Sequence, residues 1–279
     1  MECGRVWQPT KLTHVVEALT NSTKPLHIAT DQGDAIMKAV GNPEGLESLA
    51  FELVGTELAC WFGLKTPDFA ILNLLGIPKT WNPNFEIEDG YAFLSRYIQA
   101  ATYDGHGTLL KKLANPDDLA RLVVFDTWIR NSDRYPPDTY SAEIQPNLDN
   151  LMFRRSRRDK ALRYDLIVFD HTHAFSSSGF EGLHDRQLIS DDEVYGFFPP
   201  FKQYMSLRAI KSATDQLRKI DASDVKTLLD AVPSGWGVTI ELKRKWSDFI
   251  YERAQFVAET IEAKIVYQLE LWKGANDVG

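Results

Sequence analysis

The stretch that decides the fold reads FDTWIRNSDRY at residues 125–135, NLMF at 150–153 and RYDLIVFDHTHAF at 163–175. Three polar residues stand out in it. Asp133 lies in a polar turn after a helix-like segment, Asn150 opens a short apolar run, and Asp170 closes an apolar strand. Taken singly, each is typical of a turn, because Asp and Asn side chains bond the local backbone.

Their order along the chain carries more information than any one of them. An acid on a loop, an amide at a strand edge and a second acid after the next strand is the order found in phosphoryl-transfer enzymes. There the first acid takes or orients the proton of the accepting hydroxyl, while the amide and the second acid hold Mg²⁺ against the nucleotide phosphates. The stretch therefore points to phosphoryl transfer, and the case depends on what precedes it.

Composition limits the alternatives. A chain of 279 residues with 44% hydrophobic content can bury a large core, in one large domain or a two-lobed one. The net charge of −8 argues against nucleic-acid binding as the main task. Cys3 and Cys60 lack metal-type spacing and fit a reducing setting. Without a signal-peptide core or an apolar run near the ~20 residues of a membrane helix, we expect a cytoplasmic protein.

The N-terminal region predicts a hairpin that presents a lysine. Two strand-like runs, LHIAT at 26–30 and AIMKAV at 35–40, flank a turn at Gly33. Lys38 shares a face of the second strand with two aliphatic residues. A lysine at a sheet edge commonly extends its ammonium group into water. The alternative is a cation aimed into a cleft, where it would bind α- and β-phosphates.

A helix is predicted at 46–62 from apolar residues spaced three and four apart, with Gly63 as a C-terminal cap. Glu52 lies beside its apolar stripe. On its own, this glutamate is typical of a solvent-facing position. In a kinase, a helix glutamate here would instead pair with Lys38 and fix its position.

The remaining elements are predicted as strands, then helices. Strands are expected at 69–75 and 91–98, the second leading into a connector. A helix is expected at 116–130, capped by Asn115. The C-terminal third predicts amphipathic helices at 205–220, at 223–232 with Ser223 as cap, and at 239–272 as one or two helices.

This ordered combination resembles the HipA-like kinase family in its compact form. The resemblance runs from about residue 15 to 261 and rests on KPLHIATDQGDAIMKAVGN (24–42), AFELVGTELACWFGLKTPDFAIL (50–72), FDTWIRNSDR (125–134), NLMF and VFDHTHAF (168–175). It implies a two-lobed α+β protein-kinase-like fold. Residues 1–98 would form a small β-rich lobe that binds the nucleotide phosphates, and residues 99–279 a larger helical lobe.

The resemblance also implies a role for each candidate residue. Lys38 would be the nucleotide-phosphate lysine and Glu52 its helix partner. Asp133 would be the catalytic acid that orients the hydroxyl, and Asn150 and Asp170 would be the Mg²⁺ ligands. Catalysis would then come from positioning and charge neutralisation.

Two loops complete the expected ATP site. Backbone around Ser95, Arg96 and Tyr97 would hold the adenine. The phosphate-cradling loop usually carries glycines in this family, whereas here it reads Thr-Asn-Ser-Thr. Without glycine the backbone approaches phosphates less freely, and the hydroxyls of Ser22 and Thr23 are the candidate replacement donors.

A long insertion separates the acid from the metal-binding amide. Asp133 and Asn150 are 17 positions apart, with a proline-rich segment between them that would recognise substrate or cover the site. Asn147 is a rival to Asn150, which we prefer because it directly precedes the apolar run. The basic run at 154–158 is typical of a solvated hairpin tip, and the alternative is a docking patch for an acidic partner.

The expected function is ATP- and Mg²⁺-dependent transfer of the γ-phosphoryl group to a protein serine or threonine hydroxyl. The resemblance implies relatives that act as toxins of toxin–antitoxin pairs, and hence a translation-related protein substrate and an antitoxin partner. One alternative is a degenerate kinase fold that binds without transfer, favoured by the glycine-poor loop. A second is a metal-dependent hydrolase, in which His171 and His173 would ligate the metal.

Overall fold

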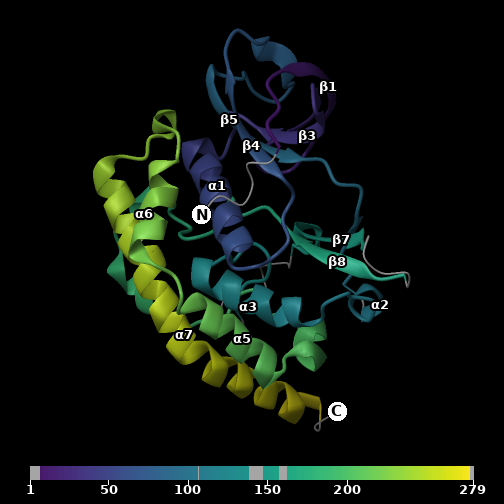
Figure 1. The fold of residues 1–279 in the computed structure, drawn as a ribbon, viewed down its shortest axis with the longest axis vertical. Coiled ribbons are helices and arrows are strands. Elements are labelled where there is room, and N and C mark those ends of the chain that lie inside the picture. Colours follow the sequence, from purple (N-terminus) through teal and green to yellow (C-terminus); the bar gives the residue numbers. More distant parts are fainter. Residues whose placement is uncertain (1–6, 106, 138–146, 157–161, 277–279) are drawn as a thin grey trace.

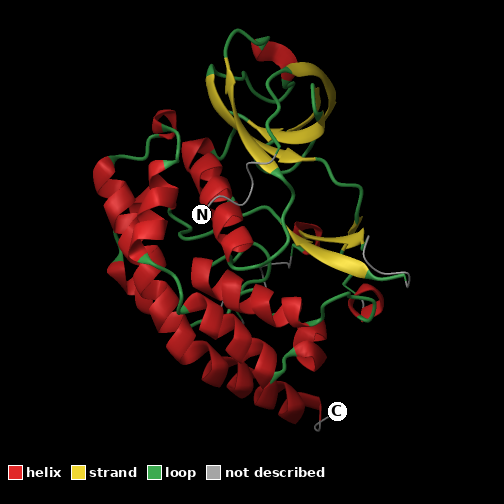
Figure 2. Ribbon diagram, in the orientation of Figure 1, coloured by secondary structure: helices red, strands yellow, loops and turns green. Residues whose placement is uncertain are grey.

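The computed structural model describes residues 7–105, 107–137, 147–156 and 162–276. Two layers of structure lie one above the other in Figure 1, a small β-rich part built from the N-terminal third and a larger part in which helices dominate. Figure 2 shows the strands of the N-terminal sheet at the upper end, the hairpin of residues 151–168 at mid-height on the right, and most of the helices below and to the left. The predicted α+β fold with a small sheet and a larger helical part is confirmed.

The N-terminal sheet has five antiparallel strands in the order β1-β2-β3-β5-β4. Its strands are β1 (Leu12–Ala18), β2 (Leu26–Thr30), β3 (Gly33–Lys38), β4 (Phe69–Leu74) and β5 (Gly90–Arg96). The predicted hairpin is β2–β3, and Gly33 takes the positive φ of 100° that its tight turn needs. Lys38 ends β3 opposite Phe93 of β5, so its side chain starts from the centre of the sheet.

A second sheet positions Asn150, which directly precedes an apolar run, and Asp170, which follows one. Its three strands, β6 (Ala101–Thr102), β7 (Leu151–Arg155) and β8 (Tyr164–Val168), pair antiparallel in sequence order. Leu151 pairs with Val168, so the residue before β7 and the residues after β8 leave the sheet at the same end. Asn150 and Asp170 are brought close together by this register.

Seven α-helices are present in the described ranges. They are α1 (Gly45–Trp61), α2 (Gly107–Leu110), α3 (Asp117–Ile129), α4 (Gly179–Gly182), α5 (Leu207–Leu217), α6 (Ala222–Asp230) and α7 (Ile240–Asn276). The region predicted as one or two helices is the single helix α7, which runs along the outside of α3 and α5 in Figure 1. No helix among these is long and apolar enough to cross a membrane.

Two predicted helix caps are wrong. Pro116 occupies the position before α3, and the Asn115 side chain instead donates to Asp118 Oδ1 at 2.8 Å. At α6, the residue before the helix is Asp221, whose carboxylate accepts from the Ser223 amide at 2.7 Å. Neighbouring Asn, Asp and Ser residues all favour caps, so propensity alone cannot select among them.

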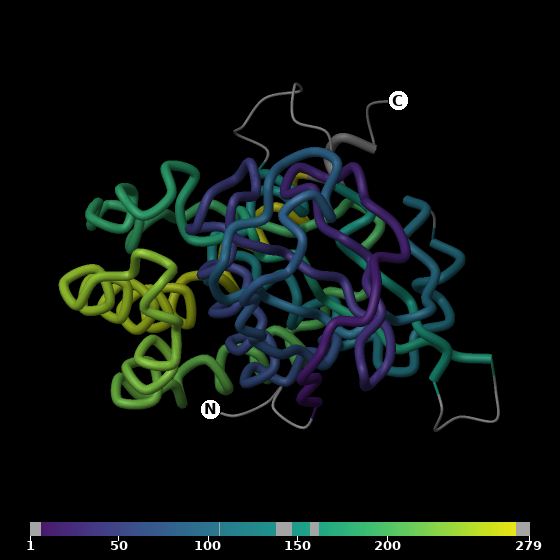
Figure 3. The backbone as a smooth tube through the Cα atoms, turned by 90° about the horizontal axis from the view of Figure 1, so that it is seen from above, coloured from purple at the N-terminus to yellow at the C-terminus, as the bar shows by residue number. Residues whose placement is uncertain are grey.

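Helix α1 joins the two parts of the fold. It lies between β3 and β4 of the N-terminal sheet in sequence, yet its apolar side chains belong to the same hydrophobic cluster as those of α3, α5, α6 and α7. Other core side chains of the sheet, such as Ile28 and Leu94, form a separate cluster, whereas Phe69 and Phe93 of the same sheet belong to the cluster of α1. Seen from above, α6 and the start of α7 lie to one side of the sheet (Figure 3). Every residue of α1 from Ser48 to Ala59 is buried, which fixes the helix in place.

Candidate functional site

Four side chains from three distant segments meet at the end of β3. Lys38 Nζ lies 2.7 Å from Glu52 Oε2 on α1, 2.9 Å from Asp170 Oδ1 and 2.7 Å from Thr172 Oγ1. Thr172 Oγ1 also donates to Glu52 Oε2 at 3.0 Å, as does the backbone N–H of His171. Glu52 is only 3% exposed, so the solvent-facing interpretation of this residue is wrong.

Electrostatic interactions keep Lys38 and Asp170 ionised. Burial by itself lowers the pKa of Lys38, but the carboxylates of Asp170 and Glu52 outweigh it and raise that pKa above its usual range. Burial would raise the pKa of Asp170, but the Lys38 ammonium group holds it well below its usual range. Lys38 and Asp170 are therefore both charged at neutral pH, and the Lys38 ammonium group is fixed in position.

The backbone at Asp170 helps to aim its carboxylate. Asp170 has a φ of 59°, in the left-handed region that few residues other than Gly, Asn and Asp adopt. The chain turns there directly after β8, and Asp170 Oδ1 reaches Lys38 across the gap between the two sheets. A strained turn of this kind costs about 1–3 kcal/mol and persists only where the surroundings hold it.

A second polar pair lies on the loop after α3. Asn150 Nδ2 donates to Asp133 Oδ2 at 2.7 Å, and Asn147 Nδ2 donates to the same oxygen at 3.3 Å. Asn150 is 2% exposed, whereas Asn147 is half-buried. Asp133 and Asn150 are thus joined by a hydrogen bond although they are 17 positions apart in sequence. Both candidate amides, Asn147 and Asn150, lie next to the acid.

Arg134 connects these two groups, and the sequence reasoning missed it. Its Nε donates to Asp126 Oδ2 on α3 at 2.8 Å, and its Nη1 donates to the backbone oxygens of Asn150 and of Phe169, the latter at 3.3 Å. Both Arg134 and Asp126 are fully buried. The Arg134 guanidinium thereby fixes the backbone of Phe169, directly before Asp170, and the backbone of Asn150. A signal was present, because Asp126 interrupts the apolar run LVVFDTWI of α3.

A cavity of about 220 Å³ opens beside Lys38. Its walls come from the β1–β2 loop, β3, β5, the residues after β5 and the β8 end, and include Lys38, Glu52 and Asp170. We call it the Lys38 cavity. Its apolar lining includes Ile36, Phe93, Met152 and Phe169. A charged end with apolar walls suits a ligand that carries both a flat ring and phosphates.

Only some of the loop residues predicted for ATP binding line the Lys38 cavity. Ser95 and Tyr97 line the Lys38 cavity, whereas the Arg96 guanidinium pairs with Asp68 at 3.2 Å. In the β1–β2 loop, Ser22 is exposed and Thr23 is buried. Neither lines the cavity, and Leu19, Asn21 and Pro25 line it from this loop instead.

His171 is placed where it cannot act with His173 as a metal ligand pair. Its ring is fully buried, meets the Phe125 ring edge-on at a centroid distance of 5.5 Å, and finds no hydrogen-bond partner among the described residues. Burial holds the pKa of His171 well below its usual range, so the ring is neutral. Nor do the described residues contain a group of three or more His, Cys, Asp and Glu side chains able to hold a metal ion.

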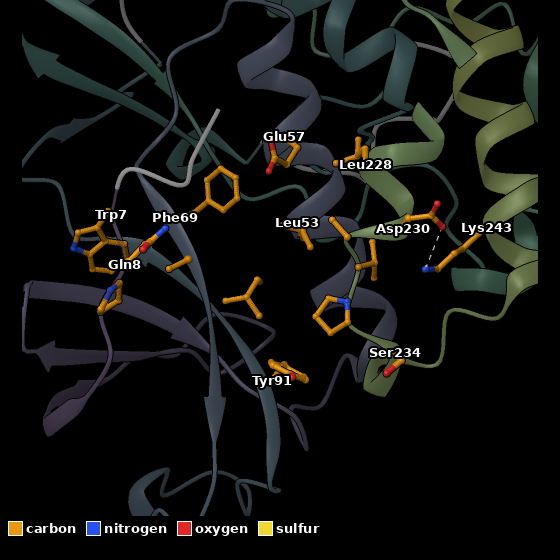
Figure 4. A pocket seen from close by; sticks show the side chains of 16 residues that line it. Trp7, Gln8, Leu53, Glu57, Phe69, Tyr91, Leu228, Asp230, Ser234 and Lys243 are labelled. Atoms are coloured by element: carbon orange, nitrogen blue, oxygen red, sulfur yellow. Dashed lines mark ion pairs between the residues drawn. The ribbon is translucent and has the colours of Figure 1, made fainter. Parts of the chain in front are cut away.

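A larger cavity of about 720 Å³ lies on the other side of α1 (Figure 4). Leu53 and Glu57 of α1 face it, while Phe69 comes from the sheet and Leu228 from α6. An Asp230–Lys243 ion pair of 3.7 Å lies at its edge. Glu52 lines the smaller cavity, where its Oε2 accepts from Lys38 Nζ. We therefore place the candidate site at the smaller cavity, because the convergent charged groups are there.

Replacing Gly55 with alanine is expected to damage the fold and the site together. A Cβ at Gly55 would lie 2.4 Å from His171 Cβ, a position tied to the backbone that cannot swing away. Helix α1 and the segment after Asp170 would be forced apart, at a cost of about 1–3 kcal/mol. Urea unfolding of Gly55→Ala measures this loss. Gly107→Ala is the matched control, since an added Cβ there meets nothing within 4 Å. Equal stability of the two variants would contradict the close packing.

Comparison with known proteins agrees with this geometry. The family model described as HipA-like kinase matches residues 15–265. Among solved structures, the crystal structure of the Helicobacter pylori proinflammatory kinase CtkA superposes with a TM-score of 0.59 at 10% sequence identity, and the match covers 91% of this chain and 96% of that one. At that identity the likeness shows the fold alone. No curated protein matches the chain.

Proposed function

The chain belongs to the HipA-like kinase family, and on that premise we propose that it transfers the γ-phosphoryl group of ATP to a serine or threonine hydroxyl of a protein, with Mg²⁺. The observation that carries the proposal is the buried contact of Lys38 with both Glu52 and Asp170, at a cavity with apolar walls. Kinases need this lysine–glutamate pair and a metal-binding acid in place together.

The residues present suit a magnesium ion. Mg²⁺ prefers oxygen ligands, and it commonly takes one or two from the protein and the rest from phosphates and water. Asp170 would supply a carboxylate. Asn150 bonds Asp133 through its amide nitrogen, which leaves its amide oxygen as the second ligand. When bound, the ion would neutralise charge that develops on the transferred phosphoryl group.

The remaining residues would position the reactants. Lys38, held by Glu52 and Thr172, would bind the α- and β-phosphates. Asp133, whose Oδ2 accepts bonds from two amides, would orient the substrate hydroxyl and take up its proton. Ser95 and Tyr97 line the Lys38 cavity where the nucleotide base would lie. Arg134 would keep Asn150 and Asp170 in register, as a positioning residue.

A direct assay tests the proposal. Purified protein is incubated with γ-labelled ATP and magnesium, and label transfer is followed to itself and to candidate protein substrates. Translation-related enzymes are tested first, and co-expression with the product of a neighbouring gene tests for an antitoxin that abolishes transfer. Phosphoamino-acid analysis then distinguishes serine and threonine from tyrosine. Transfer that is unchanged in excess EDTA would exclude the magnesium role.

A binding protein without transfer is the second candidate. It is favoured by the β1–β2 loop, which has no glycine and whose Ser22 and Thr23 do not line the Lys38 cavity. Such a protein would bind ATP with a measurable affinity in calorimetry while transferring no label. Transfer above the level of the Asp133 and Asp170 variants described below would exclude it.

Thr172→Val is expected to reduce transfer without unfolding the protein. Its hydroxyl bonds both Lys38 and Glu52, and hydrogen bonds to charged groups contribute about 1.5–3 kcal/mol each. Valine has nearly the same shape, so we expect kcat/KM for ATP to fall about 10- to 100-fold. Thr172→Ser keeps the hydroxyl and serves as the control. Wild-type kinetics in Thr172→Val would mean that the Lys38–Glu52 pair needs no third partner.

A further inference from the structure

A larger groove, lined mainly by polar residues, adjoins the Lys38 cavity. It has a volume of about 890 Å³ and is bounded by the residues around β4, the end of β5 and the β7–β8 hairpin. Tyr97 and Ile98 line both spaces, so these connector residues form the wall between them. We call this space the connector groove. A ligand there would leave the Lys38 cavity open.

Positive charge dominates the connector groove. Four cationic side chains line it, Lys65, Arg96, Arg154 and Arg155, against two acids, Asp68 and Asp165. This local surplus of two positive charges lies on a chain whose net charge is −8. The first two arginines of the basic run, Arg154 and Arg155, therefore lie in β7 and line the connector groove. They share it with Arg96 of β5 and with Lys65 from the segment before β4.

Much of the hydrogen-bonding capacity of these cations is unused. Asp165 forms ion pairs with two of them. Its Oδ1 lies 2.6 Å from Lys65 Nζ, and its Oδ2 lies 4.0 Å from Arg154 Nη2. Arg155 is exposed and makes no ion pair with a described residue, and Arg154 Nε is buried without a described hydrogen-bond partner. A guanidinium offers five N–H donors. The side chains of Lys65, Arg96 and Arg154 are also 42%, 49% and 38% exposed. Their accessible donors could therefore bind carboxylates through charge-assisted bonds.

We propose that the connector groove docks an acidic segment, rich in Asp or Glu, of the protein substrate. That the docked protein is a substrate rests on the proposed kinase function. The docking itself does not require phosphoryl transfer. A short acidic peptide would match the local surplus of charge. The net charge of −8 of the whole chain disfavours a nucleic acid, whose charged backbone would extend over more of the protein surface than a short peptide.

Docking in the connector groove would act on binding and leave the chemical step unchanged. The groove contains neither Asp133 nor Asp170, and it is separated from the Lys38 cavity by the connector. Contacts that are equally strong in the bound substrate and in the transition state lower KM and leave kcat unchanged. A substrate that carries an acidic segment should therefore differ from a neutral one in KM.

The test compares two rhodamine-labelled peptides by fluorescence anisotropy, without nucleotide. One carries six glutamates and the other six glutamines, and both carry the same serine. We expect the acidic peptide to bind at least about tenfold more tightly, and less tightly as salt rises. Arg96→Glu/Arg155→Glu should remove this preference. Arg186→Glu/Arg208→Glu makes the same charge change at exposed arginines outside the groove and should retain it.

The outcomes separate the two proposals. Equal binding of the two peptides would overturn the groove proposal, as would loss of preference in both double variants or tighter binding by a single-stranded RNA of similar charge. Phosphorylation of both peptides with equal KM would overturn it too, while leaving the kinase proposal intact. Acidic-peptide binding without any label transfer would support the groove and count against the kinase. Arg155→Glu alone replaces an exposed arginine that forms no ion pair with a described residue, so a weaker preference in this variant as well would show that misfolding is not the cause.

Discussion

Asp133→Asn and Asp170→Asn are each expected to abolish label transfer from ATP while the protein stays folded. Asparagine at 133 can still accept from Asn150 and Asn147, but it cannot take up a proton, and general-base catalysis contributes about 10²- to 10⁴-fold. Asparagine at 170 removes the charge opposite Lys38 and the carboxylate proposed for magnesium. Both changes preserve shape, so the loss should appear in kcat.

Asp149→Asn is the matched control for this pair. Asp149 is an exposed acid directly beside Asn150, and the same substitution there should leave kcat within about twofold of wild type. Thermal unfolding of all three variants is measured alongside. Asp133→Asn with wild-type kcat would remove this residue from the mechanism. Transfer retained in both site variants would mean that the chemistry takes place elsewhere.

Arg134→Met is expected to lower the free energy of unfolding by about 3–5 kcal/mol, the usual cost of leaving a buried charge without its partner. Asp126 and Arg134 are both fully buried, and Asp126 Oδ2 accepts from Arg134 Nε. Burial raises the pKa of Asp126 to about 6 even with Arg134 beside it. Methionine would fill the volume but leave the carboxylate, Asn150 O and Phe169 O without their donor.

The pH dependence of this loss has a definite sign. Without Arg134, the folded-state pKa of Asp126 rises further above its unfolded value, so folding increasingly favours the protonated acid. Wild-type stability from Asp126 falls as pH rises from about 4 to 6 and is then level. The variant continues to lose stability above pH 6. Its deficit in urea unfolding should therefore be larger at pH 8 than at pH 5.

A second substitution separates stability from positioning. Asp126→Leu/Arg134→Met removes both charges of this buried pair, and replacing a buried ion pair by apolar side chains is often neutral or stabilising. We expect the double variant to recover most of the unfolding free energy but not the activity, because Asn150 and Phe169 still lack the guanidinium. Recovery of both would show that Arg134 serves the fold alone. Arg208→Met, at an exposed arginine, should change neither.

Local pattern was sufficient for most of the fold. Period-two alternation and the Gly33 turn predicted β2 and β3, and apolar spacing predicted α1 within one residue at each end. The caps of α3 and α6 were predicted wrongly, because neighbouring polar residues compete for one position. Whether 239–272 forms one helix or two was left open, and it was decided by packing against α3 and α5.

The sequence by itself determined which residue types occur in which order: a lysine at a strand end, a helix glutamate, and the acid, amide and acid of the later loops. Only the tertiary structure decided that Glu52 is buried, that Asn150 bonds Asp133, and that Arg134 holds both halves of the site. The physical reason is the sequence separation over which each kind of interaction acts. Strand and helix periodicity depend on neighbours a few positions apart, whereas Lys38 meets Asp170 across 132 positions, and the packing of α1 into the helical core places their partner Glu52 beside them.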